Sequence, residues 1–251
     1  MKKLVQALVV SGVCALPALA MAAESPHSLS GNIGLTSNYL FRGVSQTQNG
    51  PALQGGFDYA HKSGFYAGAW ASNVAWVKEG GFKDDSSMEI DLYAGYSGSL
   101  SDDLGYDLGL ITYYYPGDKV VGVRTPDTTE VYVSGSWKFL TLKYSHVISK
   151  DFIGWVGAGG EKTRGSGYIE LNAEYDLGNG WGISGHVGHQ KVKNLSGADY
   201  TDWNVGVSKD IGFGKVTLTY SDTNADVPRF YTIAGEKLAN GKFVVSFSKD
   251  F

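Results

Sequence analysis

The sequence predicts an all-β protein, a transmembrane antiparallel up-and-down β-barrel of about 12 strands, and three observations predict it. Short segments of alternating apolar and polar residues, separated by turn residues, follow one another from residue 29 onwards. Glycine (35 residues) and tyrosine (16 residues) are abundant, which is typical of barrels. The last segment, residues 241–251, is an amphipathic strand of bilayer-spanning length that ends on Phe251.

The beginning of the chain is typical of a cleaved secretory signal peptide. Two lysines precede an apolar run, residues 4–19, and A-x-A cleavage sites lie within residues 18–23. We therefore expect a leader over residues 1–23 and a single β-barrel domain over residues 24–251. Cys14 is the only cysteine of the sequence and lies inside the apolar run, so the mature chain has no disulfide.

Charge and hydropathy exclude two classes of protein. Without the two lysines of the leader, 19 basic side chains stand against 25 acidic ones, a balance of −6, which argues against nucleic acid as a partner. After the leader, no apolar run approaches the roughly 18–20 residues of a spanning helix. A membrane crossing must therefore use strands.

Twelve segments alternate with period two, the pattern of strands with one apolar and one polar face. They are residues 29–41, 51–60, 65–76, 88–98, 104–115, 128–137, 139–148, 167–176, 181–190, 200–209, 215–221 and 241–251. In the clearest of them, Leu171 lies on the apolar face and Glu170 on the polar face. The facing of residues 65–76 is ambiguous, because glycine and alanine occupy both parities.

The connections between these segments alternate in length. Long polar loops follow the odd-numbered segments, and tight turns such as residues 177–180 follow the others. Short periplasmic turns and long outer loops are typical of outer-membrane barrels. We therefore expect both termini in the periplasm.

Aromatic residues of the apolar faces gather at strand ends, as in the two interfacial girdles of membrane barrels. At the outer rim we expect Tyr39, Phe41 and Tyr220. At the inner rim we expect Tyr59, Tyr96, Tyr106, Trp137, Tyr175 and Trp181. Outer-membrane lipid is the partner that such faces predict.

The end of the chain resembles the C-terminal signature by which the barrel assembly machinery recognises bacterial outer-membrane barrels. The resemblance makes Phe251 the expected assembly signal and that machinery an expected partner. Lys249 departs from the signature, because an aromatic or apolar residue usually stands there.

The polar faces carry the candidate lumen-lining residues. They are Asp58, Glu89, Asp91, Asp107, Glu130, Glu170, Glu174 and Asp202, with Lys143 and Lys242 within strands and Arg42 at the rim. An unpaired buried carboxylate is very costly, and these cations are too few to pair the acids. Water in the lumen is the simplest resolution. The alternative is a barrel plugged by loops, in which tyrosines hydrogen-bond the acids.

Catalytic residues, metal ligands and cofactor sites are not expected, so an enzyme is not predicted. Residues 154–163 are rich in glycine, but Glu161 stands where a phosphate-binding loop needs glycine. His186 and His189 face opposite sides of one strand, and no spacing makes the histidines converge with other ligands or with a serine.

Three stretches, residues 31–47, 51–59 and 64–73, resemble the TorF family of proteobacterial outer-membrane porins. The resemblance is specific over residues 31–73 and continues to the C-terminus by strand pattern only. It implies an outer-membrane barrel with a channel, and it supplies no substrate or catalytic residue.

Two functions therefore stay open. The first is a passive channel for small solutes that prefers cations, because acids outnumber bases by eight to two among the candidate lumen-lining residues within the strands. Wall charges in a narrow bore act on ions with little screening, and Glu89, Asp91 and Glu130 are expected to matter most. The second is a non-conducting structural or surface-interaction barrel whose extracellular loops bind a partner.

Overall fold

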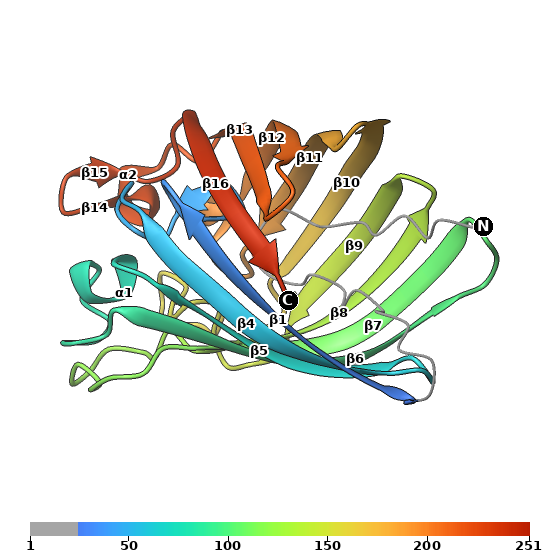
Figure 1. Ribbon diagram of the computed structural model, residues 1–251. Coiled ribbons are helices and arrows are strands. Elements are labelled where there is room, and N and C mark those ends of the chain that lie inside the picture. The colour runs from blue at the N-terminus through green and yellow to red at the C-terminus, as the bar shows by residue number, and fades with distance from the viewer. Residues whose placement is uncertain (1–24) are drawn as a thin grey trace.

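Residues 25–251 of the computed structural model form one closed antiparallel β-barrel of twelve strands (Figure 1). This confirms the predicted fold class and strand number. The expected signal peptide, residues 1–23, lies outside the described residues.

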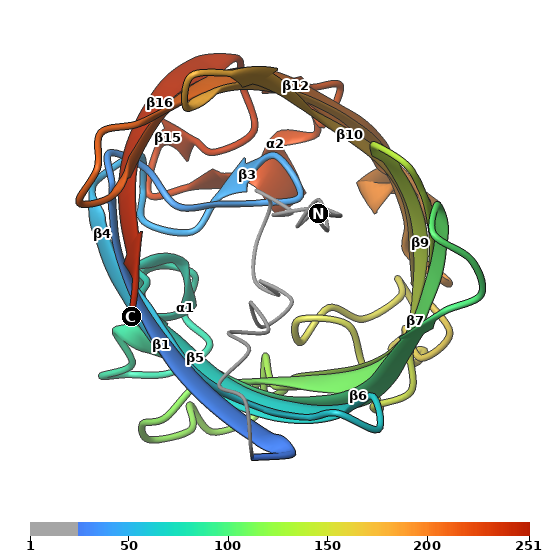
Figure 2. The ribbon, with the colours of Figure 1, turned by 45° about the vertical axis from the view of Figure 1, so that its right-hand side comes forward.

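Twelve strands form the wall, and each pairs with its neighbour in the chain (Figure 2). In order they are β1 (His27–Thr36), β4 (Ala52–His61), β5 (Phe65–Asn73), β6 (Met88–Ser99), β7 (Leu104–Tyr114), β8 (Thr128–Trp137), β9 (Leu140–Val147), β10 (Gly167–Gly178), β11 (Trp181–Lys191), β12 (Tyr200–Asp210), β13 (Lys215–Thr223) and β16 (Lys242–Asp250). The connections hold the short elements β2 (Leu40–Phe41), β3 (Val44–Ser45), α1 (Trp76–Glu79), η1 (Ser196–Ala198), α2 (Pro228–Tyr231), β14 (Thr232–Ile233) and β15 (Glu236–Lys237).

The first and last strands close the ring. β1 pairs with β16 from Thr36 opposite Ser246 to Asn32 opposite Asp250. One further rung follows, because Gly31 and Phe251 exchange backbone hydrogen bonds of 2.7 and 2.9 Å. The ring of Phe251 lies over Gly31, where a Cβ would come within 2.8 Å of it. Closure leaves the wall without an unpaired edge.

The two faces of the wall differ as the alternation predicts. Leu29, Phe57 and Phe65 point outward and are 82, 72 and 62% exposed. Asp58 and Tyr66, their neighbours in the chain, are buried inside. The exposed fraction of Phe65 also resolves the facing of β5, whose even-numbered residues point inward. An apolar exterior on a closed barrel is the surface that faces lipid.

The two ends of the barrel are unlike. The connections 62–64, 100–103, 138–139, 179–180 and 211–214 are short and gather at one end, here called the turn end. The longer connections, with α1, α2 and the two small hairpins, gather at the other, the loop end (Figure 1). Asn179 and Gly180 both have positive φ (53° and 75°), as a two-residue type I′ turn requires. Among residues 25–251, no helix is long and apolar enough to cross a membrane.

Two predicted segments extend past the C-terminal ends of their wall strands. The other ten agree with wall strands to within two residues at each end. Segment 29–41 leaves the wall after Ser37, whose N–H still donates to the Val245 carbonyl. The Asn38 side chain then accepts from Ser45 Oγ at 2.7 Å, which helps to turn the chain inward. Segment 65–76 ends at Asn73, and α1 follows.

The one-sided wall gives a prediction for β10, where Leu171 is 41% exposed and Glu170 is 8% exposed. Leu171→Arg places a charge in lipid and should destabilise the barrel by about 2–4 kcal/mol. Glu170→Gln should cost far less, because an amide can still hydrogen-bond inside. Urea unfolding of protein refolded into lipid vesicles measures both. Equal losses in the two variants would contradict the assigned facing.

Candidate functional site

The predicted lumen residues line the inner face of the wall in two groups. Six acids are less than a tenth exposed: Asp58, Glu89, Asp91, Glu130, Glu170 and Asp202. Asp107, Lys143 and Glu174 are half-buried and lie on the turn-end half of their strands. Arg42, expected at the rim, is instead buried inside the barrel.

Tyrosine hydroxyls supply many of the donors for these carboxylates. Tyr39 donates to Glu89 at 2.6 Å and Tyr66 donates to Asp107 at 2.7 Å. Tyr93 donates to Asp58 in the same way. Each hydroxyl comes from a different segment of the chain than its acid, so these bonds fasten neighbouring parts of the barrel together. A tyrosine donor satisfies an acid but adds no positive charge to the interior.

Glycine makes room for these rings. Gly68 lies beneath Tyr93, and a Cβ there would come within 2.5 Å of the Tyr93 hydroxyl. The inward tyrosine and the inward glycine therefore occupy complementary positions on adjacent strands. This packing accounts in part for the abundance of both residue types.

A hairpin between β1 and β4 crosses the interior. Leu40 pairs with Ser45 and Phe41 with Val44, so Arg42 and Gly43 form a two-residue turn at the tip. Both have positive φ (49° and 77°), the combination of a type I′ turn. Figure 2 shows this hairpin reaching inward from the wall. A Cβ on Gly43 would come within 2.8 Å of the Asp202 side chain, so the tip abuts β12.

Arg42 ties the tip of the hairpin to the opposite wall. One guanidinium nitrogen donates to Glu130 Oε2 on β8 at 2.7 Å, and the other donates to Gln190 Oε1 on β11 at 2.7 Å. The guanidinium also lies 4.3 Å from the centre of the Tyr168 ring. Burial alone would lower the pKa of Arg42, but the Glu130 carboxylate outweighs it and raises that pKa above its ordinary value.

A second polar network surrounds His186 on β11. Its Nε2 lies 2.9 Å from Asp202 Oδ2, and its Nδ1 lies 2.7 Å from Asn172 Oδ1. The Tyr168 hydroxyl contacts both His186 and Asp202 at 2.9 Å. His189, by contrast, points outward to Thr201, so the two histidines face opposite sides as predicted. Over the described range 25–251, no group of three or more His, Cys, Asp or Glu side chains is arranged to hold a metal ion.

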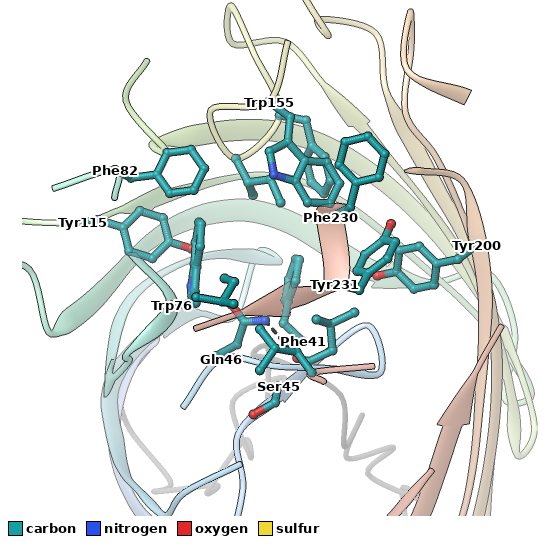
Figure 3. A pocket seen from close by; sticks show the side chains of 15 residues that line it. Phe41, Ser45, Gln46, Trp76, Phe82, Tyr115, Trp155, Tyr200, Phe230 and Tyr231 are labelled. Carbon is teal, nitrogen blue, oxygen red and sulfur yellow. Dashed lines mark hydrogen bonds between the residues drawn. The ribbon is translucent and has the colours of Figure 1, made fainter. Parts of the chain in front are cut away.

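Aromatic side chains from several loops pack together inside the loop end. They surround a small apolar pocket in which Trp76 and Tyr115 stand opposite Tyr200 and Tyr231, with Trp155 between them (Figure 3). The rings of Trp76 and Tyr115 meet edge to face at 5.3 Å, as do those of Tyr200 and Tyr231. The loops therefore form a packed layer over this end of the barrel.

The prediction of a water-filled lumen is therefore wrong for the loop-end half of the barrel. That half matches the alternative, a barrel plugged by loops in which tyrosines hydrogen-bond acids. Arg42, the cation predicted at the rim, lies inside the barrel and pairs with Glu130. Tyr39 donates to Glu89, which would otherwise be unpaired. The half-buried Asp107, Lys143 and Glu174 mark the turn-end half as the more accessible part of the interior.

Two of the predicted girdle aromatics are wrong. Tyr39 is 3% exposed and donates to Glu89, and Phe41 packs on Tyr113 inside the barrel, because both lie on the inward-turning chain. Of the others, Trp137, Tyr175 and Trp181 are about half exposed, and Tyr59, Tyr96, Tyr106 and Tyr220 are half-buried. The predicted girdle omitted four exposed aromatics at the loop end that lie on the outward face: Tyr114, Tyr144, Trp203 and Phe243.

Comparison with known proteins places the chain in a family. A family model described as a bacterial protein of unknown function (Gcw_chp) matches residues 20–251. The chain belongs to this family. No curated protein matches the sequence.

Solved structures share the fold at low sequence identity. The KdgM porin is similar with a TM-score of 0.56 at 10% identity, covering 88% of this chain and 99% of that one. The NanC porin is similar with a TM-score of 0.52 at 11% identity, covering 89% and 99%. A twelve-stranded barrel with an apolar exterior, in a bacterial family, is an outer-membrane protein.

The ion pair at the hairpin tip gives a second prediction. Arg42→Met strands the Glu130 carboxylate in a buried site and should destabilise the barrel by about 3–5 kcal/mol. Arg42→Met combined with Glu130→Gln removes both charges and should recover much of that loss. Urea unfolding of the two variants measures the difference, with Lys143→Met as a half-buried control. Equal stability of the single variant and wild type would show that the pair does not form.

Proposed function

We propose that this protein is a porin-like channel of the outer membrane through which small solutes diffuse passively. The observation that carries the proposal is a closed wall, apolar outside and lined inside with carboxylates. The shared fold of the KdgM and NanC porins supports it, as does the resemblance to the TorF family over residues 31–73.

The solutes differ in charge from the one bound by KdgM, which is known in complex with oligogalacturonate. Oligogalacturonate carries a carboxylate on each sugar, and an acidic wall repels such a chain. Hydrogen bonds from tyrosines to several of these acids add no positive charge to the wall. The bore therefore favours cations or neutral solutes.

The topology of the proposed channel follows from its two ends. We propose that the turn end faces the periplasm with both termini, and that the loop end faces outward. Support comes from β1 beginning and β16 ending on the turn-end side, together with the short connections there. Lipid contacts the apolar wall, and the barrel assembly machinery recognises the closing strand with Phe251.

A non-conducting barrel is the second candidate function. It is favoured by the packed loop layer and by the hairpin that crosses the loop-end half of the interior. In that case the loops would serve contact with a partner rather than passage of solutes.

Replacement of the hairpin separates the two candidates. A variant with residues 40–45 replaced by a Gly-Ser sequence of equal length loses the Arg42 tether, so its single-channel conductance in a planar bilayer should exceed that of wild type. A Gly-Ser replacement of the exposed residues 121–123 should leave conductance unchanged. Absence of conductance in wild type and in the hairpin variant would favour the non-conducting barrel.

Cation preference is tested at the accessible half of the bore. Asp107→Asn with Glu174→Gln removes two half-buried lumen charges, so the reversal potential across a salt gradient should move towards zero. Glu236→Gln on exposed β15 removes a charge outside the bore and should have little effect. An anion preference in wild type would overturn the acidic-bore argument.

A further inference from the structure

Asp91 differs from the other buried acids of the barrel. It lies on β6 with its side chain inside and is 0% exposed. Among the described residues neither carboxylate oxygen of Asp91 has a hydrogen-bond partner. Asp58, another buried inward-facing aspartate of the wall, accepts from Tyr93. Burial of a carboxylate without a compensating partner is strongly unfavourable.

The surroundings of Asp91 add to this cost. Glu89 is two residues away on the same face of β6, and Glu130 lies on β8. Both carboxylates repel the charge of Asp91. Three carboxylates therefore share one region of the interior.

The cation and donors nearby are committed to other groups. Arg42 places one guanidinium nitrogen on Glu130 and the other on Gln190. Tyr39 donates to Glu89 at 2.6 Å. One guanidinium against three carboxylates leaves a local excess of negative charge centred on Asp91.

We propose that Asp91 is the principal ligand of a site for a small inorganic cation inside the barrel, beside the hairpin that carries Arg42. A bound cation compensates the buried charge of Asp91 and relieves its repulsion by Glu89 and Glu130. Carboxylate oxygens are hard ligands, which suits alkali-metal and alkaline-earth ions. This inference deepens the proposed channel, since it names a binding site for the ions that such a channel would prefer.

The site is enclosed in the loop-end half of the barrel and suits a weakly bound ion. Within residues 25–251, no set of three or more acidic, histidine or cysteine side chains converges to enclose a metal. The protein therefore supplies an incomplete set of ligands, which makes binding weak.

Unfolding in matched salts tests the site without measuring conduction, so its failure leaves the channel proposal standing. The thermal midpoint of refolded wild type is compared in potassium chloride and in N-methylglucamine chloride of equal ionic strength, the organic cation being too large for the site. A tenfold excess of K⁺ over its Kd should raise the midpoint by about 3–6 °C. Asp91→Asn should abolish this difference, and the matched Asp58→Asn should keep it.

Equal wild-type midpoints in the two salts, or a difference that persists in Asp91→Asn, would overturn the proposal. If Asp91→Asn does not fold, a second measurement decides. Crystals of wild type grown in rubidium chloride should show an anomalous scattering peak within coordinating distance of the Asp91 carboxylate. A peak confined to other carboxylates would count against the site.

Discussion

Closure of the wall is the constraint on which the rest of the structure depends. Once β1 pairs with β16, and Gly31 with Phe251, each strand has partners on both sides and its register is fixed. A fixed register determines which face of each strand meets lipid, because a slip by one residue would exchange the faces. Lipid accepts only the apolar face, so the eight candidate lumen acids are confined to the interior. These acids therefore need hydrogen-bond donors or cations inside the barrel.

Inside the barrel, these acids are satisfied mainly by neutral hydrogen-bond donors. A tyrosine hydroxyl satisfies a carboxylate and its ring fills space, and neither function requires a buried cation, whose desolvation is costly. The ring needs room, which an inward glycine such as Gly68 provides. The abundance of tyrosine and of glycine thus reflects one packing arrangement. Because a tyrosine adds no positive charge, it leaves the excess of acids over bases in the interior unchanged.

The alternation of apolar and polar residues was sufficient to predict the wall strands, because each wall strand has lipid on one side. It failed at residues 38–41, where Tyr39 and Phe41 continue the alternation although the chain has left the wall. Gly43 after Arg42 was the local signal of a turn there. The partners of the acids could not be predicted, since they are distant in the chain. Tyr39 and Glu89 are 50 residues apart, and Arg42 and Gln190 are 148 apart.

The position of the hairpin depends on charge more than on its own backbone pairing. Two strands of two residues have little stability alone, so contacts with the wall must hold them. Desolvation offsets most of the attraction between Arg42 and Glu130, so their pair adds little net stability. A displaced hairpin, however, would leave both charges buried and unpaired, which is far less favourable. The pair therefore specifies one location for the hairpin and gives the loop end of the bore a defined shape.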